Sequence, residues 1–200
     1  MKLLIVCGSL QQRSANRAAL EVASGAAVAR GVAVDDFERL AEIPAFDSDR
    51  GEDPIEAIDE FRRRIDAADA VLIAAPEYAG GLSGVVKNAL DWLVGSATMY
   101  RKPVGVISAG TTGGEHARRM MTQTLTWQGA YVVAELGISA PRTKSADDGR
   151  FTDAGTVDAI TRLTETLVDT ASMTPAERRQ LALRVVGRLG VDTAHVITER

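Results

Sequence analysis

The architecture of this chain follows from the segment MKLLIVCGSLQQRSAN at residues 1–16. Residues 3–7 are apolar without interruption, and the polar residues 8–16 follow at once. An apolar run that does not alternate with polar residues is typical of a strand buried on both faces, as in a parallel sheet covered by helices. The segment therefore predicts a central strand, a polar loop and the start of a helix.

Similar apolar runs and helical patterns alternate along the rest of the chain. Three further runs, at residues 70–75, 104–107 and 131–136, resemble the first, and a weaker, charged run at 32–37 suits an edge strand. Apolar residues recur at helical spacing within segments 15–30, 55–65, 85–93, 117–125 and 157–168. Strand and helix alternate five times, which predicts an α/β doubly wound, five-stranded parallel sheet with helices on both faces.

An extra helix is predicted near the C-terminus. Thr174 is a plausible N-cap, and Pro175 suits the first helical position. Three apolar residues within 181–189 would share one face of this helix. We therefore divide the chain into a main domain, residues 1–172, and a C-terminal helical extension, residues 173–200, that is either part of the same domain or an oligomer contact.

The overall charge and the few metal-binding residue types exclude several classes of function. Lys and Arg total 23 against 27 Asp and Glu, so the net charge of −4 gives no electrostatic case for binding nucleic acid or an anionic membrane. A single cysteine, Cys7, excludes an intramolecular disulfide. The two histidines, His116 and His195, lie far apart in the sequence, so we expect no metal site.

The distribution of apolar residues predicts a soluble, cytoplasmic protein. The apolar run at residues 3–7 is too short for a signal peptide, because Gln11, Gln12 and Arg13 follow where such a run should continue. No apolar stretch approaches the roughly 20 residues that span a bilayer. One cysteine also fits a reducing compartment.

Ligands of an open parallel sheet bind beyond the carboxyl ends of its strands, so the loops there are candidate sites. The loop at residues 8–16 has neither the G-x-G-x-x-G pattern of dinucleotide sites nor the pattern of a P-loop. It does bring hydroxyls, amides and a guanidinium to a helix start, where backbone N–H groups and the helix dipole favour phosphate. The alternative is ordinary helix capping by Ser14 in a solvated loop.

Two further loops follow the third and fourth predicted buried strands. Residues 76–84 contain three glycines, which would let a flat ligand lie against the backbone. The alternative, a flexible surface loop, is less attractive because Pro76 stiffens it and Tyr78 would be exposed. Residues 108–114 repeat the glycine-rich pattern and also lead into a helix.

At these three loops the sequence resembles the NADPH-dependent FMN reductase family, which includes quinone, chromate and azo-dye reductases. The resemblance is carried by GSLQQRSAN at 8–16, PEYAGGLSGVVKNALDW at 76–92 and KPVGVISAGTTGG at 102–114, with a weaker match, EIPAFDSD, at 42–49. It covers residues 1–170 in the same order. It implies a flavodoxin-like fold with strand order 2-1-3-4-5 and FMN as cofactor.

The resemblance also implies roles for particular residues. The first loop would wrap the FMN phosphate, the second would hold one edge of the isoalloxazine ring, and the third would close the site from the other side. The residues so implied are Ser9, Leu10, Gln11, Arg13, Ser14, Ala15, Asn16, Pro76, Glu77, Tyr78, Ala79, Gly80, Ser108, Gly110 and Gly113.

The chain departs from the family pattern at three positions. Gln11 stands where the family usually has arginine, Ala79 where it often has asparagine, and Ser83 where it usually has proline. FMN phosphate needs compensating positive charge, so we hypothesise that Arg13 replaces the missing arginine. The alternative is that Arg13 points to solvent and that amides and hydroxyls hold the phosphate.

The function implied is transfer of hydride from NADPH or NADH through bound FMN to a small acceptor such as a quinone or free flavin. The cofactor would carry the chemistry, so no catalytic side chain is expected. The alternatives are a flavodoxin-like electron carrier without enzymatic activity and a nucleotide-binding regulatory module. The family pattern also implies a homodimer or homotetramer, with the helix at 83–94, including Trp92, near the subunit contact.

Several residues receive structural interpretations. We expect Cys7, Met120 and Met121 to lie in the core. Lys87 and Asp91 are spaced i, i+4 and should pair. We expect His116 to be solvated at a helix start and Glu77 to have a structural or flavin-edge role rather than that of a general acid; Ser14 and Ser83 are plausible N-caps.

Overall fold

The computed structural model describes residues 1–50 and 54–196 and has a five-stranded parallel sheet at its centre. Along the sheet the strand order is β2-β1-β3-β6-β7, which is the predicted flavodoxin-like order 2-1-3-4-5. The prediction of the fold is therefore confirmed. The strands are β1 (Lys2–Cys7), β2 (Ala33–Phe37), β3 (Ala70–Ala74), β6 (Pro103–Gly110) and β7 (Tyr131–Ser139).

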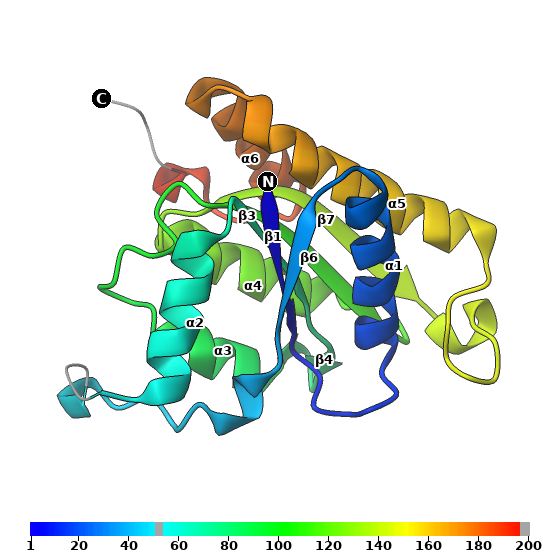
Figure 1. Ribbon diagram of the computed structural model, residues 1–200, viewed down its shortest axis with the longest axis horizontal. Helices are drawn as coiled ribbons and strands as arrows, with labels where there is room; N and C mark the ends of the chain where they lie inside the picture. Colours follow the sequence, from blue (N-terminus) through cyan, green and yellow to red (C-terminus); the bar gives the residue numbers. More distant parts are fainter. Residues whose placement is uncertain (51–53, 197–200) are drawn as a thin grey trace.

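Helices cover both faces of this sheet (Figure 1). On one face lie α1 (Ala15–Ala29) and α5 (Ala154–Asp169). On the other lie α2 (Glu56–Ala67), α3 (Gly84–Asp91) and α4 (Glu115–Trp127). No helix in the described residues is long and apolar enough to cross a membrane.

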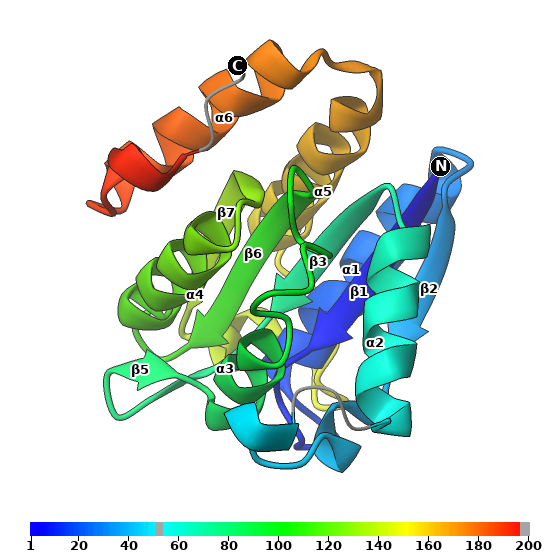
Figure 2. The same ribbon diagram turned by 90° about the vertical axis from the view of Figure 1, so that its left-hand side faces the viewer.

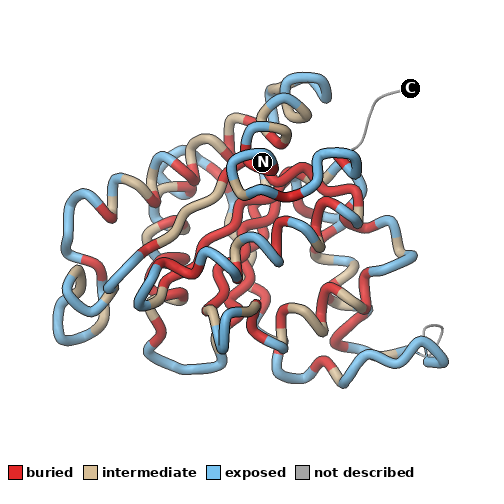
Figure 3. The backbone as a smooth tube through the Cα atoms, turned by 180° about the vertical axis from the view of Figure 1, so that it is seen from behind, coloured by how far each residue is buried: buried red, intermediate tan, exposed pale blue. Residues whose placement is uncertain are grey.

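The hydrophobic core lies in two layers, one on each side of the sheet. Successive residues of a strand point to opposite faces, so Val71 and Ile73 pack toward α2 and α3, whereas Leu72 and Ala74 pack toward α1 and α5. The central strands β1, β3 and β6 are buried along nearly their whole length (Figure 3), apart from the half-buried Lys2 and Gly110 at their ends. Because both faces are buried, the strand sequences are continuously apolar rather than alternating.

The C-terminal helix α6 (Pro175–Arg188) packs against β7, at one edge of the sheet (Figure 2). It begins with a capping box, in which the Thr174 side chain accepts a bond from the N–H of Glu177 and the Glu177 carboxylate accepts one from the N–H of Thr174. Its buried side chains, Ala182, Val185 and Val186, face the rest of the protein.

A short β-hairpin follows β3, where the sequence predicted only a glycine-rich loop. Its strands are β4 (Glu77–Tyr78) and β5 (Gly81–Leu82), joined by a two-residue turn. Both turn residues have positive φ, 50° at Ala79 and 72° at Gly80, as in the turns that match the twist of a hairpin. Figure 2 shows the hairpin at the end of the sheet toward which the strands run.

One of the structural interpretations, that of Met120, is wrong. Met120 is half exposed on the outer side of α4, while its neighbour Met121 is fully buried, because adjacent helical residues cannot share a face. Ser83 occupies the N-cap position of α3, but its hydroxyl makes no capping bond. Ser14 does cap α1, as predicted, and Lys87 pairs with Asp91 at 2.6 Å.

Candidate functional site

Hydrogen bonds join the loops that follow β1, β3 and β6 into one site at the carboxyl edge of the sheet. The Ser83 hydroxyl donates to the carbonyl of Gly8 at 3.0 Å, which ties the first loop to the segment after the hairpin. Glu77 accepts a bond from the backbone N–H of Ala117 at 3.1 Å, which ties the hairpin to the first turn of α4. The structure thus brings together the three loops in which the site residues were predicted.

Only glycine fits at position 8, where the first loop packs against Ala75 and Val86. A Cβ on Gly8 would lie 2.4 Å from a methyl group of Val86 and 2.8 Å from the Cβ of Ala75. Both contacts are far inside normal van der Waals separation. Gly8 therefore sets the path of the first loop toward α1.

The first loop presents backbone donors at the start of α1. The Ser14 side chain accepts a bond from the N–H of Arg17 at 3.0 Å. The N–H groups of Arg13, Ala15 and Asn16 find no acceptor within residues 1–50 and 54–196. Free N–H groups and the positive end of a helix dipole form a site for an anion, so this loop fits a phosphate group.

Asn16 has a structural role that the sequence did not predict. Its side chain is 2% exposed; the amide nitrogen donates to the carbonyl of Ala109 at 3.1 Å, and the amide oxygen accepts from the N–H of Ala109 at 2.9 Å. These bonds fasten the start of α1 to the end of β6. The amide predicted to bind phosphate is thus engaged within the protein, whereas the backbone N–H of Asn16 stays available.

The positive charges near this loop differ in their environment. Arg17 forms an ion pair with Asp36 of β2, and burial raises the pKa of Asp36 even though this ion pair acts in the opposite direction. Arg13 is exposed and makes no ion pair with any described residue. Gln11 and Gln12 are exposed and neutral. Arg13 is therefore the cation of this loop that remains available to a ligand.

In the second loop an exposed aromatic ring, that of Tyr78, follows the buried Pro76 and the hydrogen-bonded Glu77. Pro76 is buried, and Glu77 caps α4 through Ala117, which confirms a structural role for this glutamate. Tyr78 is 59% exposed, and the hairpin tip, Ala79 and Gly80, is exposed as well. Contacts of the tip with a ligand must come from the backbone, because neither residue has a polar side chain.

The third loop turns sharply into α4. Gly113 and Gly114 both have positive φ, 82° and 60°, and a Cβ on Gly114 would lie 1.9 Å from the Ser108 hydroxyl oxygen. Ser108 is fully buried beneath this turn, so its side chain points away from the surface that we expected it to close. Gly110 is half-buried at the end of β6. This loop therefore offers its backbone and the exposed hydroxyls of Thr111 and Thr112, rather than the side chain of Ser108.

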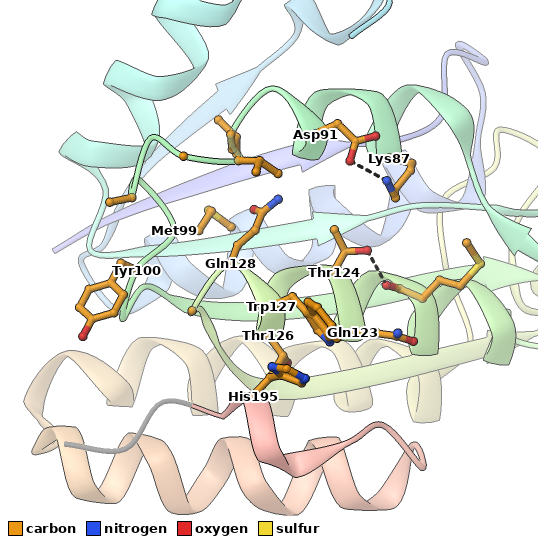
Figure 4. Close-up of a pocket in the computed structure, with 16 residues that line it drawn as sticks. Lys87, Asp91, Met99, Tyr100, Gln123, Thr124, Thr126, Trp127, Gln128 and His195 are labelled. Atoms are coloured by element: carbon orange, nitrogen blue, oxygen red, sulfur yellow. Dashed lines mark hydrogen bonds and ion pairs between the residues drawn. The ribbon is translucent and has the colours of Figure 1, made fainter. Parts of the chain in front are cut away.

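A large cavity lies along the outer side of α3 and α4 (Figure 4). Its volume is about 870 Å³, and Lys87, Asp91, Trp127 and His195 are among the residues that line it. His195 stacks on Trp127, with ring centroids 3.9 Å apart. Only the Met120 end of this cavity approaches the hairpin, where the Met120 sulfur would be 3.5 Å from a Cβ on Gly81.

The fold is flavodoxin-like, and the loop at the start of α1 has the free backbone N–H groups described above. Residues 1–144 match the model of the family described as NADPH-dependent FMN reductase. The chain belongs to this family, which confirms the predicted class of a flavin enzyme that uses FMN with NAD(P)H as reductant. Among the described residues, no cluster of His, Cys, Asp and Glu could hold a metal ion.

Individual relatives agree with this assignment. The chain is 34% identical to an NAD(P)H-dependent FMN reductase of Pseudomonas aeruginosa, over 76% of this chain and 85% of the relative. It is 28% identical to a quinone reductase of Escherichia coli, over 80% of this chain and 90% of the relative. Among solved structures it resembles FerB, an NAD(P)H:(acceptor) oxidoreductase of Paracoccus denitrificans, with a TM-score of 0.72, 26% identity, and coverage of 86% of this chain and 97% of FerB.

Proposed function

We propose that this chain reduces a small acceptor such as a quinone, with NAD(P)H as electron donor and FMN held at the carboxyl edge of the sheet. When bound, FMN accepts a hydride from NAD(P)H and passes reducing equivalents to the acceptor. The main support is the group of backbone N–H donors at Arg13, Ala15 and Asn16, which have no acceptor among the described residues. Beside them lies the exposed guanidinium of Arg13, which makes no ion pair with that part of the chain.

The first loop would bind the phosphate. The free N–H groups at the start of α1 would donate hydrogen bonds to the phosphate oxygens. The Ser14 hydroxyl can also donate to the phosphate while its oxygen accepts the bond from the N–H of Arg17. Ser9 is half-buried beside this loop and adds a second hydroxyl. Arg13 would supply the formal positive charge that Gln11 lacks.

The ring would lie between the hairpin and the loop after β6. On one side residues 76–80 provide the exposed Tyr78 and the backbone of the turn. On the other side residues 108–113 provide backbone amides and the exposed hydroxyls of Thr111 and Thr112, while the Ser108 side chain is buried. Such a site binds and orients a flat ring, and it needs no side chain that donates or accepts a proton.

Turnover with different acceptors tests this function. NADPH oxidation by the FMN-loaded protein is followed with a benzoquinone, with free FMN and with no added acceptor, under anaerobic conditions. Rapid multiple turnover with the quinone supports the proposal. A single turnover in all three cases, with oxidation only when a redox protein is added, would favour an electron carrier instead.

We also propose that two copies of the chain associate through the cavity between α3 and α4. Large apolar side chains are exposed around it, namely Val94, Tyr100, Met120 and Trp127. Concentrated apolar surface of this kind commonly marks a protein interface. The predicted subunit contact at residues 83–94 overlaps this location through Lys87, Asp91 and Val94, whereas Trp92 is buried in the core.

A cytoplasmic location remains a proposal. It is supported by the composition, because a chain with one cysteine has no intramolecular disulfide to lose in a reducing compartment. Fractionation of cells that produce the protein, followed by immunodetection, would test it directly.

A further inference from the structure

An ion pair with little exposure to solvent connects β7 to α4, just beyond the loop after β6. The carboxylate of Glu135 in β7 pairs with the guanidinium of Arg118 in α4, and their side chains are only 9% and 14% exposed. On its other oxygen the same carboxylate pairs with Arg188, in the last turn of α6, at 3.1 Å. Three elements thus meet at one carboxylate: α4, β7 and the C-terminal helix.

A β-bulge in β7 aims Glu135 at α4. Val132 pairs with Val104 but Ala134 pairs with Gly105, so Val133 is an extra residue in β7. Val132 packs on the α4 face of the sheet, whereas Val133 and Ala134 both belong to the opposite face. Without the extra residue, strict alternation from Val132 would place Glu135 on the α1 and α5 face.

Arg118 in turn holds the turn that leads into α4. Its Nε donates to the carbonyl of Gly113 at 3.1 Å. The space around this bond is tight, because a Cβ on Gly137 would lie 2.6 Å from the Gly113 oxygen and 2.9 Å from an Arg118 nitrogen. The guanidinium therefore fixes the position of the Gly113 carbonyl from inside the protein.

We propose that Glu135 is a positioning residue for the cofactor: by orienting Arg118 it sets the conformation of the loop at residues 110–114 and thereby the affinity for FMN. This inference rests on the proposed function, which places the flavin ring against that loop. Glu135 itself lies beneath the surface and does not touch the ligand.

The two ion pairs should contribute unequally. A guanidinium with little access to water needs its counter-charge, so loss of the Glu135 charge leaves Arg118 poorly compensated. Arg188 is 62% exposed, and exposed ion pairs contribute little. We therefore expect Glu135 to matter much more than Arg188, with α6 as a secondary support.

The test compares Glu135→Gln, Arg118→Met, the double variant and Arg188→Met. The matched control is Arg184→Met, one turn earlier in α6, where the guanidinium makes no ion pair with a described residue. Amide exchange of residues 110–116 is measured without FMN, and the Kd for FMN and the kcat at saturating FMN are measured for each protein. The amide exchange does not depend on any activity.

For Glu135→Gln we expect faster exchange confined to the loop and a Kd for FMN raised about three- to tenfold, with kcat restored by excess FMN. Arg118→Met should have the same effect, and the double variant should add nothing, because Glu135 acts through Arg118. Arg188→Met should raise the Kd by about twofold at most, and Arg184→Met should match the parent.

Different results would overturn different claims. Faster loop exchange in Glu135→Gln with an unchanged Kd would overturn the positioning role while leaving the reductase function intact. Additive losses in the double variant would also overturn it, because Glu135 would then act independently of Arg118. A parent protein that does not bind FMN in the same titration would overturn the proposed function itself.

Discussion

At the scale of single residues, the charge of the phosphate loop depends on which arginine is free. A helix N-terminus supplies only about half an elementary charge, which is less than a phosphate dianion requires. Arg17 is already paired with Asp36, while Arg13 is exposed and unpaired among the described residues. The structure therefore favours Arg13 over Arg17 as the residue that compensates for Gln11.

We predict that Arg13→Ala raises the Kd for FMN about tenfold or more, since a hydrogen bond to a charged group is worth about 1.5–3 kcal/mol. The salt dependence of binding should fall as well, because a charge is lost. Arg17→Ala should change FMN affinity less and should instead lower stability. Fluorescence titrations at two salt concentrations measure this. Parent-like affinity and salt dependence in Arg13→Ala would rule out the compensation.

A second prediction concerns the hairpin turn, where Ala79 has a φ of 50°. An alanine in this left-handed region is strained, and glycine is not. Ala79→Gly should therefore stabilise the protein by about 0.5–1 kcal/mol. The control is Ala29→Gly in the last turn of α1, which should destabilise it. Chemical denaturation measures both; destabilisation by Ala79→Gly would contradict the observed turn.

The residue types of the site were predictable from the sequence, but several of their partners were not. Asn16 bonds to Ala109, 93 positions away, and Ser83 bonds to Gly8, 75 positions away. A local pattern can show that a serine or asparagine lies at a helix start, and for Ser14 the capping prediction is confirmed. It cannot show which distant backbone group competes for the same side chain.

At the scale of elements, the long buried strands were predictable and the local irregularities were not. Continuous apolar runs identified β1, β3, β6 and β7 because both faces of the sheet are covered. The hairpin strands are two residues each, too short for any periodicity. The bulge at Val133 could not be predicted, because the residues on both sides of it are apolar and show no alternation. It nevertheless determines which face of the sheet the Glu135 side chain points to.

The capping box of α6 gives a prediction for pH dependence. Hydrogen bonds from Thr174 hold the pKa of Glu177 below its usual value. A carboxyl with a lowered pKa in the folded state contributes stability above its unfolded pKa, about 4.3, and loses it as pH falls through the folded pKa. Amide exchange of α6, corrected for intrinsic rates, should therefore accelerate selectively under acidic conditions.

Thr174→Ala removes the side-chain partner of Glu177 and should accelerate the exchange of α6 already at neutral pH. The acid effect should then be smaller in this variant. Equal acid sensitivity of α6 in the variant and the parent would show that the capping box is not its cause. The exchange of α1, which is capped by the neutral Ser14, serves as the internal reference.

At the scale of the whole molecule, the apolar cavity between α3 and α4 predicts a homodimer. Val94, which lines it, is 63% exposed, and Val28 on α1 is 60% exposed on the other side of the sheet. Val94→Asp should therefore shift a dimer toward monomer, because it would bury a charge in the interface. Val28→Asp should not. Light scattering at micromolar concentration measures the mass of the parent protein and of both variants. A monomeric parent protein would contradict the dimer.

The most direct test of the account as a whole is the visible absorption of the flavin during one anaerobic titration. FMN is bound to the purified protein, NAD(P)H is added, and a quinone is added afterwards. We expect NAD(P)H to bleach the absorption of the bound flavin and the quinone to restore it. Flavin that binds but stays oxidised when NAD(P)H is in excess would contradict it.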